Sequence, residues 1–188
     1  TRRSSDLFCL LAGVVSLTGC GGAEPDLPEL GPAPQFQLTA HDDEAAFDSV
    51  VELEGHPYIT YFFFTSCSGP CPAMTEAMVA LTERFDDAEN LRFVGVTVDP
   101  ATDTPERLRQ YAEQYGATDE RLTYLTGADG AIQRLARDGF KLGSWDEPML
   151  HSTRFILVDG NGQIRGYFNG VFEEDLAALN DAVDALVG

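Results

Sequence analysis

The chain has little positive charge. Its 188 residues include 12 lysines and arginines against 31 aspartates and glutamates, giving a formal net charge of −19, and Lys141 is the single lysine. Such a surface repels a phosphate backbone, so we predict no nucleic-acid partner. The acids are spread along the chain rather than clustered. This spread favours a role in keeping the protein soluble at high salt, although an acidic surface could instead steer a basic partner.

The sequence also lacks a hydrophobic run long enough to span a membrane. Its apolar stretch at residues 7–17 is too short for a spanning helix. The stretch follows Arg2 and Arg3 and ends in Leu17-Thr18-Gly19-Cys20, an order that resembles a bacterial lipoprotein signal. We therefore predict a signal peptide at residues 1–19, diacylation of Cys20, and a membrane-anchored lipoprotein on the extracytoplasmic side, since two acyl chains suffice for stable anchoring.

Cysteine is scarce, with four in the chain. Cys9 belongs to the predicted signal peptide and Cys20 is the predicted acylation site, so Cys67 and Cys71 remain as the free thiols. An extracytoplasmic location permits a disulfide, so these two could cycle between oxidised and reduced forms.

Repeats and low-complexity blocks are absent, and the chain length suits one domain. Residues 20–34 are rich in Gly, Pro and acids without an apolar period, which predicts a flexible tether, with the domain at residues 35–188. Periodicity predicts strands at 58–64, 91–98 and 122–125, helices at 71–85, 105–115, 129–137 and 173–187, and a hairpin at 155–168. This order is typical of an α/β domain with a thioredoxin-like fold, a central mixed sheet flanked by helices.

Cys67 and Cys71 stand between a predicted strand and a predicted helix. Pro72 fits the first turn of that helix, and i, i+4 spacing would put both thiols on one helical face, where the helix dipole favours thiolate. Thiolates bind soft metals and attack disulfides, so the pair indicates metal or redox chemistry. The alternative is a structural disulfide or two buried free cysteines.

A proline is missing where thioredoxin-type reductases place one. Those enzymes carry Cys-x-x-Cys and a cis-proline just before the strand that faces the cysteines. This chain has Cys67-Ser68-Gly69-Pro70-Cys71, with one more residue between the thiols, and His151-Ser152-Thr153 at the second position. A histidine therefore stands where the proline would be.

Three motifs in this order resemble the Sco/SenC family over about residues 35–187. The motifs are Phe64-Thr65-Ser66-Cys67 to Cys71-Pro72, Val98-Asp99-Pro100 with Asp103-Thr104-Pro105, and His151 ahead of Phe155-Ile156-Leu157-Val158-Asp159. The resemblance implies a copper-binding thioredoxin-like protein that helps mature the binuclear copper centre of cytochrome c oxidase. It implies Cys67, Cys71 and His151 as copper ligands, and the copper-binding oxidase subunit or another copper chaperone as partner. Two departures are Ser68, where many members have proline, and the lipid anchor in place of a transmembrane helix.

The residue chemistry agrees with this resemblance. Two thiolates and an imidazole suit Cu(I), and they can hold Cu(II) with a fourth donor, although ligand type alone does not exclude zinc. Asp99 and Asp103 could orient His151 or a ligand-bearing loop, or could serve only as a turn and a helix cap.

The remaining soft donors and histidines have weaker sequence support. Met149 is an open candidate as a further ligand, whereas helical spacing places Met74 and Met78 in the core. His41 and His56 lack comparable context and are predicted to be ordinary loop residues.

Two principal functions compete. The first is a membrane-tethered copper chaperone, and the second is a thiol-disulfide reductase in which Cys67 and Cys71 form a disulfide while reducing the cysteines of a copper-accepting protein. A metal site needs His151, whereas dithiol exchange needs only the cysteines. A peroxide-reducing role ranks last, because no activating arginine is adjacent to Cys67.

Overall fold

The computed structural model describes residues 27–42, 45–143 and 153–188. Its elements, in chain order, are β1 (Gln37–Ala40), β2 (Ala46–Asp48), α1 (Ser49–Glu52), β3 (Tyr58–Phe63), α2 (Cys71–Arg84), β4 (Arg92–Thr97), α3 (Pro105–Gln114), β5 (Leu122–Thr126), α4 (Asp129–Arg134), the π-helical turn Leu135–Gly139, β6 (Arg154–Val158), β7 (Ile164–Asn169) and α5 (Glu173–Val187). The predicted signal peptide, Cys20, Met149 and His151 lie outside the described residues.

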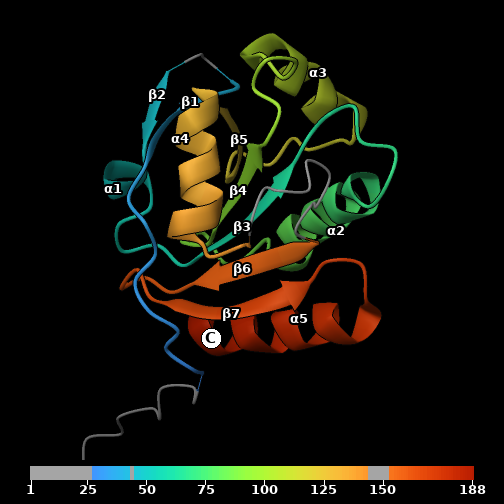
Figure 1. Ribbon diagram of the computed structural model, residues 1–188. Helices are drawn as coiled ribbons and strands as arrows, with labels where there is room; N and C mark the ends of the chain where they lie inside the picture. Colours follow the sequence, from blue (N-terminus) through green and yellow to red (C-terminus); the bar gives the residue numbers. More distant parts are fainter. Residues whose placement is uncertain (1–26, 43–44, 144–152) are drawn as a thin grey trace, which may run out of the picture.

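One mixed sheet forms the centre of the domain, in the order β2-β1-β5-β4-β3-β6-β7 (Figure 1). Strands β3, β4 and β5 run parallel, while β6 and β7 form an antiparallel hairpin beside β3. The core on one face includes residues of α2, α3 and α5, and the core on the other includes residues of α4 and the π-helical turn. The predicted mixed sheet flanked by helices is therefore confirmed.

Strand β3 shows why its sequence is apolar throughout. Ile59, Tyr61 and Phe63 face the core with α2, α3 and α5, while Tyr58 and Phe62 face the opposite core. Successive strand residues point to opposite faces, so a strand covered on both sides has no polar alternation. This burial fixes the position of the residues that follow Phe63.

Several predicted boundaries are confirmed. Helix α3 begins at Pro105, and the Thr104 hydroxyl accepts a hydrogen bond from the Arg107 amide at 3.3 Å, as an N-cap should. Helix α5 has the predicted bounds, and the predicted hairpin is β6 and β7. The sequence analysis missed β1, β2 and α1, each only three or four residues long. Such short elements carry too little periodic pattern to be recognised.

Residues 27–34 are not a free tether in the structure. The Leu30 amide donates to Ile164 O, the Ile164 amide donates to Gly31 O, and the Ala33 amide donates to Gly162 O, each at 2.8 Å. The predicted start of the folded part, near residue 35, is therefore too late. The Gly and Pro content of this segment predicted a tether. The segment can still pair with the hairpin, because Leu30, Gly31 and Ala33 make the hydrogen bonds and Pro32 has no amide that needs a partner. Within the described part of the chain, no helix is both long and apolar enough to cross a membrane.

Candidate functional site

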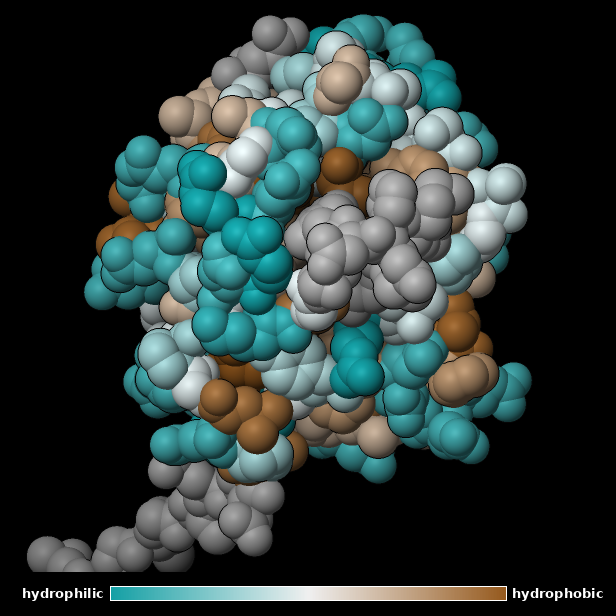
Figure 2. Space-filling view, in the orientation of Figure 1, coloured by the Kyte–Doolittle hydropathy of each residue, from teal (hydrophilic) through white to brown (hydrophobic). Residues whose placement is uncertain are grey.

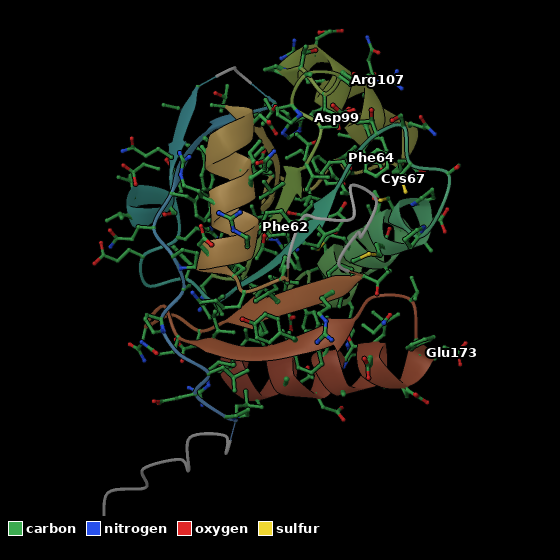
Figure 3. All side chains as sticks on the ribbon, viewed as in Figure 1. Phe62, Phe64, Cys67, Asp99, Arg107 and Glu173 are labelled. Atoms are coloured by element: carbon green, nitrogen blue, oxygen red, sulfur yellow. The ribbon has the colours of Figure 1, made fainter. Side chains whose placement is uncertain are left out.

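The loop between β3 and α2 carries Cys67 (Figure 3), and Cys71 is the first residue of α2; neither cysteine is in a disulfide. The Cys67 amide donates to Phe64 O at 3.2 Å, and the Gly69 amide lies 3.4 Å from Cys67 Sγ. Helix α2 begins at Cys71, with Pro70 as its N-cap residue. Both thiols thus lie at the carboxyl edge of β3, as predicted.

Cys67 does not lie on the helix. It sits in the preceding turn, so the expectation that helical i, i+4 spacing aligns the two thiols is wrong. The turn brings the two side chains close enough to interact instead, because the Cys67 thiol contributes to the raised pKa of Cys71. Cys67 is partly exposed and Cys71 is fully buried. A ligand from solution therefore meets Cys67 first.

Burial raises the pKa of the Cys71 thiol to about 12, and the adjacent Cys67 thiol adds to this rise. Neighbouring backbone amides lower the pKa by less. The predicted thiolate-favouring effect of the helix start is therefore wrong for Cys71 in the metal-free protein. Cys71 stays protonated at neutral pH until a cation displaces its proton.

Asp103 ties the cysteine loop to the end of β4. It is completely buried, and its carboxylate accepts from the Thr65 amide at 3.0 Å and from the Thr65 and Thr97 hydroxyls at 2.5 Å each. The Thr65 hydroxyl also accepts from Arg107 Nε at 3.2 Å. Of the two roles considered for Asp103, orientation of the ligand-bearing loop is the one that these contacts support. The described hydrogen bonds of Asp99 use its backbone: its amide donates to the Thr97 hydroxyl, and its carbonyl accepts from the Thr102 and Asp103 amides.

His151 lies outside the described residues, but the topology gives the edge of the sheet that it precedes. Strand β6 runs antiparallel to β3, with Thr60 opposite Ile156 and Tyr58 opposite Val158. The amino end of β6 therefore lies beside the carboxyl end of β3, the edge that carries the cysteines. The described part of the chain holds no group of three metal-ligating side chains.

A buried hydroxyl chain under the start of α2 was missed by the sequence analysis. Thr75 lies one turn after Cys71, and its Oγ1 is 2.9 Å from the Tyr61 hydroxyl and 2.7 Å from the Tyr111 hydroxyl. A threonine on an otherwise apolar helix face signals such a partner, since buried hydroxyls are hydrogen-bonded. These hydrogen bonds among the three hydroxyls hold α2 against β3 and α3.

The other candidates are placed as follows. Met74 and Met78 are fully buried in the core, as predicted. His56 Nδ1 lies 2.9 Å from Asn90 O on the surface. His41 is more constrained than an ordinary loop residue, because its Nδ1 accepts from the Tyr124 amide at 3.1 Å and burial lowers its pKa.

A family model described as SCO1/SenC matches residues 28–186. The chain belongs to the SCO1/SenC family. The motif resemblance is thus confirmed over nearly all of the described residues. A SCO1 protein homolog of Bacillus subtilis (strain 168) is 29% identical over 171 residues, covering 86% of this chain and 87% of that protein.

Solved structures of SCO1/SenC proteins share this fold. A family lipoprotein from Bacillus anthracis str. Ames has a TM-score of 0.74 at 26% identity, covering 84% of this chain and 95% of that one. ScoI of Bradyrhizobium japonicum, solved with copper bound, has a TM-score of 0.60 at 25% identity, covering 80% and 99%. In this SCO1/SenC chain, the turn offers two neighbouring sulfur donors, which suit a soft metal such as Cu(I).

Proposed function

We propose that this chain is a membrane-tethered copper chaperone. It binds copper through Cys67, Cys71 and His151, and delivers it during assembly of the copper centre of cytochrome c oxidase. The observation that carries the proposal is the pair of neighbouring free thiols in a turn held by the buried Asp103. The copper-bound Bradyrhizobium japonicum relative supports the choice of metal.

Copper is the cargo of this site, so the site must both hold and release it. Cys71 is buried and shields one metal bond from water, whereas Cys67 is partly exposed. An incoming thiolate can reach a metal on the Cys67 side and replace that ligand before the others. Binding converts both thiols to thiolates, so each loading event releases protons to solvent.

The partner in this proposal is the copper-binding subunit of the oxidase. The protein BsSco, whose structure shares this fold, is described as a member of the Sco family of cytochrome c oxidase assembly proteins. The tether is the diacylated Cys20, and the Bacillus anthracis neighbour is itself described as a lipoprotein. The Bacillus anthracis lipoprotein supports a lipid-anchored protein here.

A copper titration of the reduced protein without oxygen tests the site. We expect one Cu(I) per chain, and no binding after oxidation to the Cys67–Cys71 disulfide, because the disulfide removes both thiolate donors. His151→Ala should weaken binding strongly, since water is a poor donor to Cu(I). Equal binding by the disulfide form would contradict the proposed ligands.

A thiol-disulfide reductase is the second candidate, because both cysteines are free and adjacent. The partly exposed Cys67 would attack the substrate disulfide, and Cys71 would resolve the mixed disulfide. The same His151→Ala variant separates the two functions. A reductase would keep dithiol exchange and oxidase maturation without this imidazole, whereas a chaperone would lose maturation.

A further inference from the structure

The loop between β7 and α5 presents two apolar side chains to solvent. Phe172 is 56% exposed and Val171 is 38% exposed. Figure 3 places Glu173, which follows them at the start of α5, on the same side of the molecule as Cys67. Figure 2 shows hydrophobic atoms among hydrophilic ones on that side. The loop is therefore exposed near the cysteine edge.

Two sets of contacts fix this loop between the segments that carry the proposed ligands. The Gly170 amide donates to Thr153 O at 2.7 Å, and Asn169 Nδ2 donates to Thr153 Oγ1 at 3.1 Å, two residues after His151. On the other side, a Cβ on Gly170 would come within 3.0 Å of the Met74 side chain, in the first turn of α2 after Cys71. The loop thus packs directly against the start of α2, the helix that begins at Cys71.

The start of helix α5 does not explain why residue 172 is a phenylalanine. Phe172 is the N-cap residue of α5, and no side chain caps the helix there. Serine, threonine, aspartate and asparagine are preferred at this position because their oxygens accept an orphan amide. An exposed phenylalanine gives up that cap and buries only part of its ring. A residue that breaks a local rule without a gain inside the fold points to a role outside it.

Charge defines the partner that fits. Glu173 and Glu174 follow the apolar pair and are exposed, while Asp175 is engaged with the Asn169 amide at 2.7 Å. An apolar centre with a charged rim is the usual anatomy of a specific protein interface. Two exposed carboxylates beside the apolar pair favour lysine or arginine on the facing rim.

We propose that residues 171–174 are the docking surface for the protein that receives copper, and that this partner presents an apolar recess rimmed by Lys or Arg. The inference rests on the proposed chaperone function. Because the loop is bonded next to the His151 segment and packed against the start of α2, a partner seated on it brings its metal-binding residues beside Cys67. Phe172 is the anchor, since a partly exposed aromatic ring loses the most water-accessible apolar surface on docking.

The test measures copper transfer from the Cu(I)-loaded chain to the reduced, metal-free copper-binding domain of the same organism's oxidase subunit. Phe172→Ser should lower the second-order transfer rate about tenfold or more, the effect of losing one interface anchor. Its copper affinity should equal wild type, and its thermal midpoint should be unchanged or higher, because serine caps helices. Val51→Ser is the matched control, since Val51 is 73% exposed on α1.

The acidic rim is tested separately. Glu173→Gln combined with Glu174→Gln should slow transfer at low salt and weaken its dependence on salt. An unchanged transfer rate for Phe172→Ser would overturn the docking surface. A faster transfer rate for the double glutamine variant would overturn the basic rim of the partner.

Failure of the chaperone function gives a different result. If wild-type protein binds no Cu(I) or passes none to the domain, the proposed function is wrong. The surface is then decided by direct binding of the reduced, copper-free chain to the same immobilised domain. Binding that Phe172→Ser loses would support the surface, and no binding by wild type would overturn it.

Discussion

Single residues of one chemical type behave differently here because their surroundings differ. Cys67 and Cys71 are both thiols, yet one is partly exposed and the other is fully buried. Asp99 and Asp103 come from one motif, yet only Asp103 has a described side-chain role, holding the cysteine loop. Sequence identifies such residues as candidates, but burial and partners decide what each one does.

Replacing Asp103 tests whether the turn needs its anchor. Asp103→Asn keeps the size but removes the charge and leaves an amide NH₂ facing hydroxyl donors, so the turn loses charge-assisted hydrogen bonds to Thr65 and Thr97. We expect the free energy of unfolding to fall by about 2–4 kcal/mol, since buried hydrogen bonds to charged groups contribute roughly 1.5–3 kcal/mol each. Urea unfolding measures the loss, and copper affinity should fall with it.

Glu106→Gln is the control for this substitution. Glu106 is exposed and pairs with Arg109 on the surface of α3 at 2.6 Å, a contact that solvent screens. Its unfolding curve should overlay that of wild type. An Asp103→Asn protein as stable as this control would show that the carboxylate does not hold the loop.

At the scale of elements, the sequence predicts long buried elements well and short ones poorly. The run from Tyr58 to Phe63 and the pattern of α5 are long enough for period to decide them. Strand β2 has three residues, and residues 27–34 are ordered by pairing with β7 rather than by their own pattern. Such segments depend on contacts far away in the chain, which no local period records.

For the candidate site too, the sequence predicts some features and not others. Motifs identified Cys67, Cys71 and Asp103 as candidates, because residue type and spacing carry that information, but the loop role of Asp103 was one of two open interpretations until its contacts were known. Spacing alone could not show that Cys67 precedes the helix, because four residues span either a helical turn or a looser turn. It also could not show that burial outweighs the helix dipole at Cys71, because burial depends on what the fold packs around the thiol.

The position of each thiol relative to α2 predicts a difference in reactivity. With reduced, metal-free protein and iodoacetamide at pH 7–8, we expect Cys67 to be alkylated well before Cys71. Only thiolate reacts, and Cys71 combines burial with a pKa raised to about 12. Mass spectrometry of peptides after timed quenching gives both rates. Alkylation of Cys71 should speed up as pH rises toward that pKa.

The raised pKa of Cys71 also makes the free energy of unfolding depend on pH. A thiol whose pKa is higher in the folded protein than in the unfolded chain favours folding below the unfolded value, near 9, and this contribution is lost as pH rises toward 12. Cys71→Ala should therefore reduce the loss of unfolding free energy between these pH values.

For the alkylation experiment, equal rates for the two cysteines at neutral pH would contradict the described difference in exposure.

At the scale of the whole molecule, the first described residues and the cysteines lie at opposite ends of the sheet. Residues 30–33 bond to Gly162 and Ile164 at the turn end of the β6–β7 hairpin. That end lies beside Tyr58 at the start of β3, while the cysteine loop follows Phe63 at its other end. Six residues of strand span about 20 Å. Residues 30–33 are thus held at the end of the sheet opposite the cysteine loop.

Anchoring at Cys20 would therefore orient the domain. The seven residues from Cys20 to Leu27 reach at most about 25 Å, at about 3.5 Å each. If Cys20 is diacylated, as we propose, it would hold the hairpin-turn end near the bilayer and leave the cysteine edge facing away from it. A partner in the same membrane would then meet the cysteine edge at a raised local concentration, without needing a strong interface.

Cys20→Ser tests this arrangement. Without its acyl chains, the protein should leave the membrane fraction, measured by detergent partitioning, while the purified protein keeps its copper affinity. Oxidase maturation in cells should fall at ordinary expression levels and recover on overexpression, because free concentration replaces the tether. Cys9→Ser, in the predicted signal peptide, should remain anchored. Wild-type protein found soluble with its first twenty residues intact would show that Cys20 is not the anchor, and the orientation derived from it would fall as well.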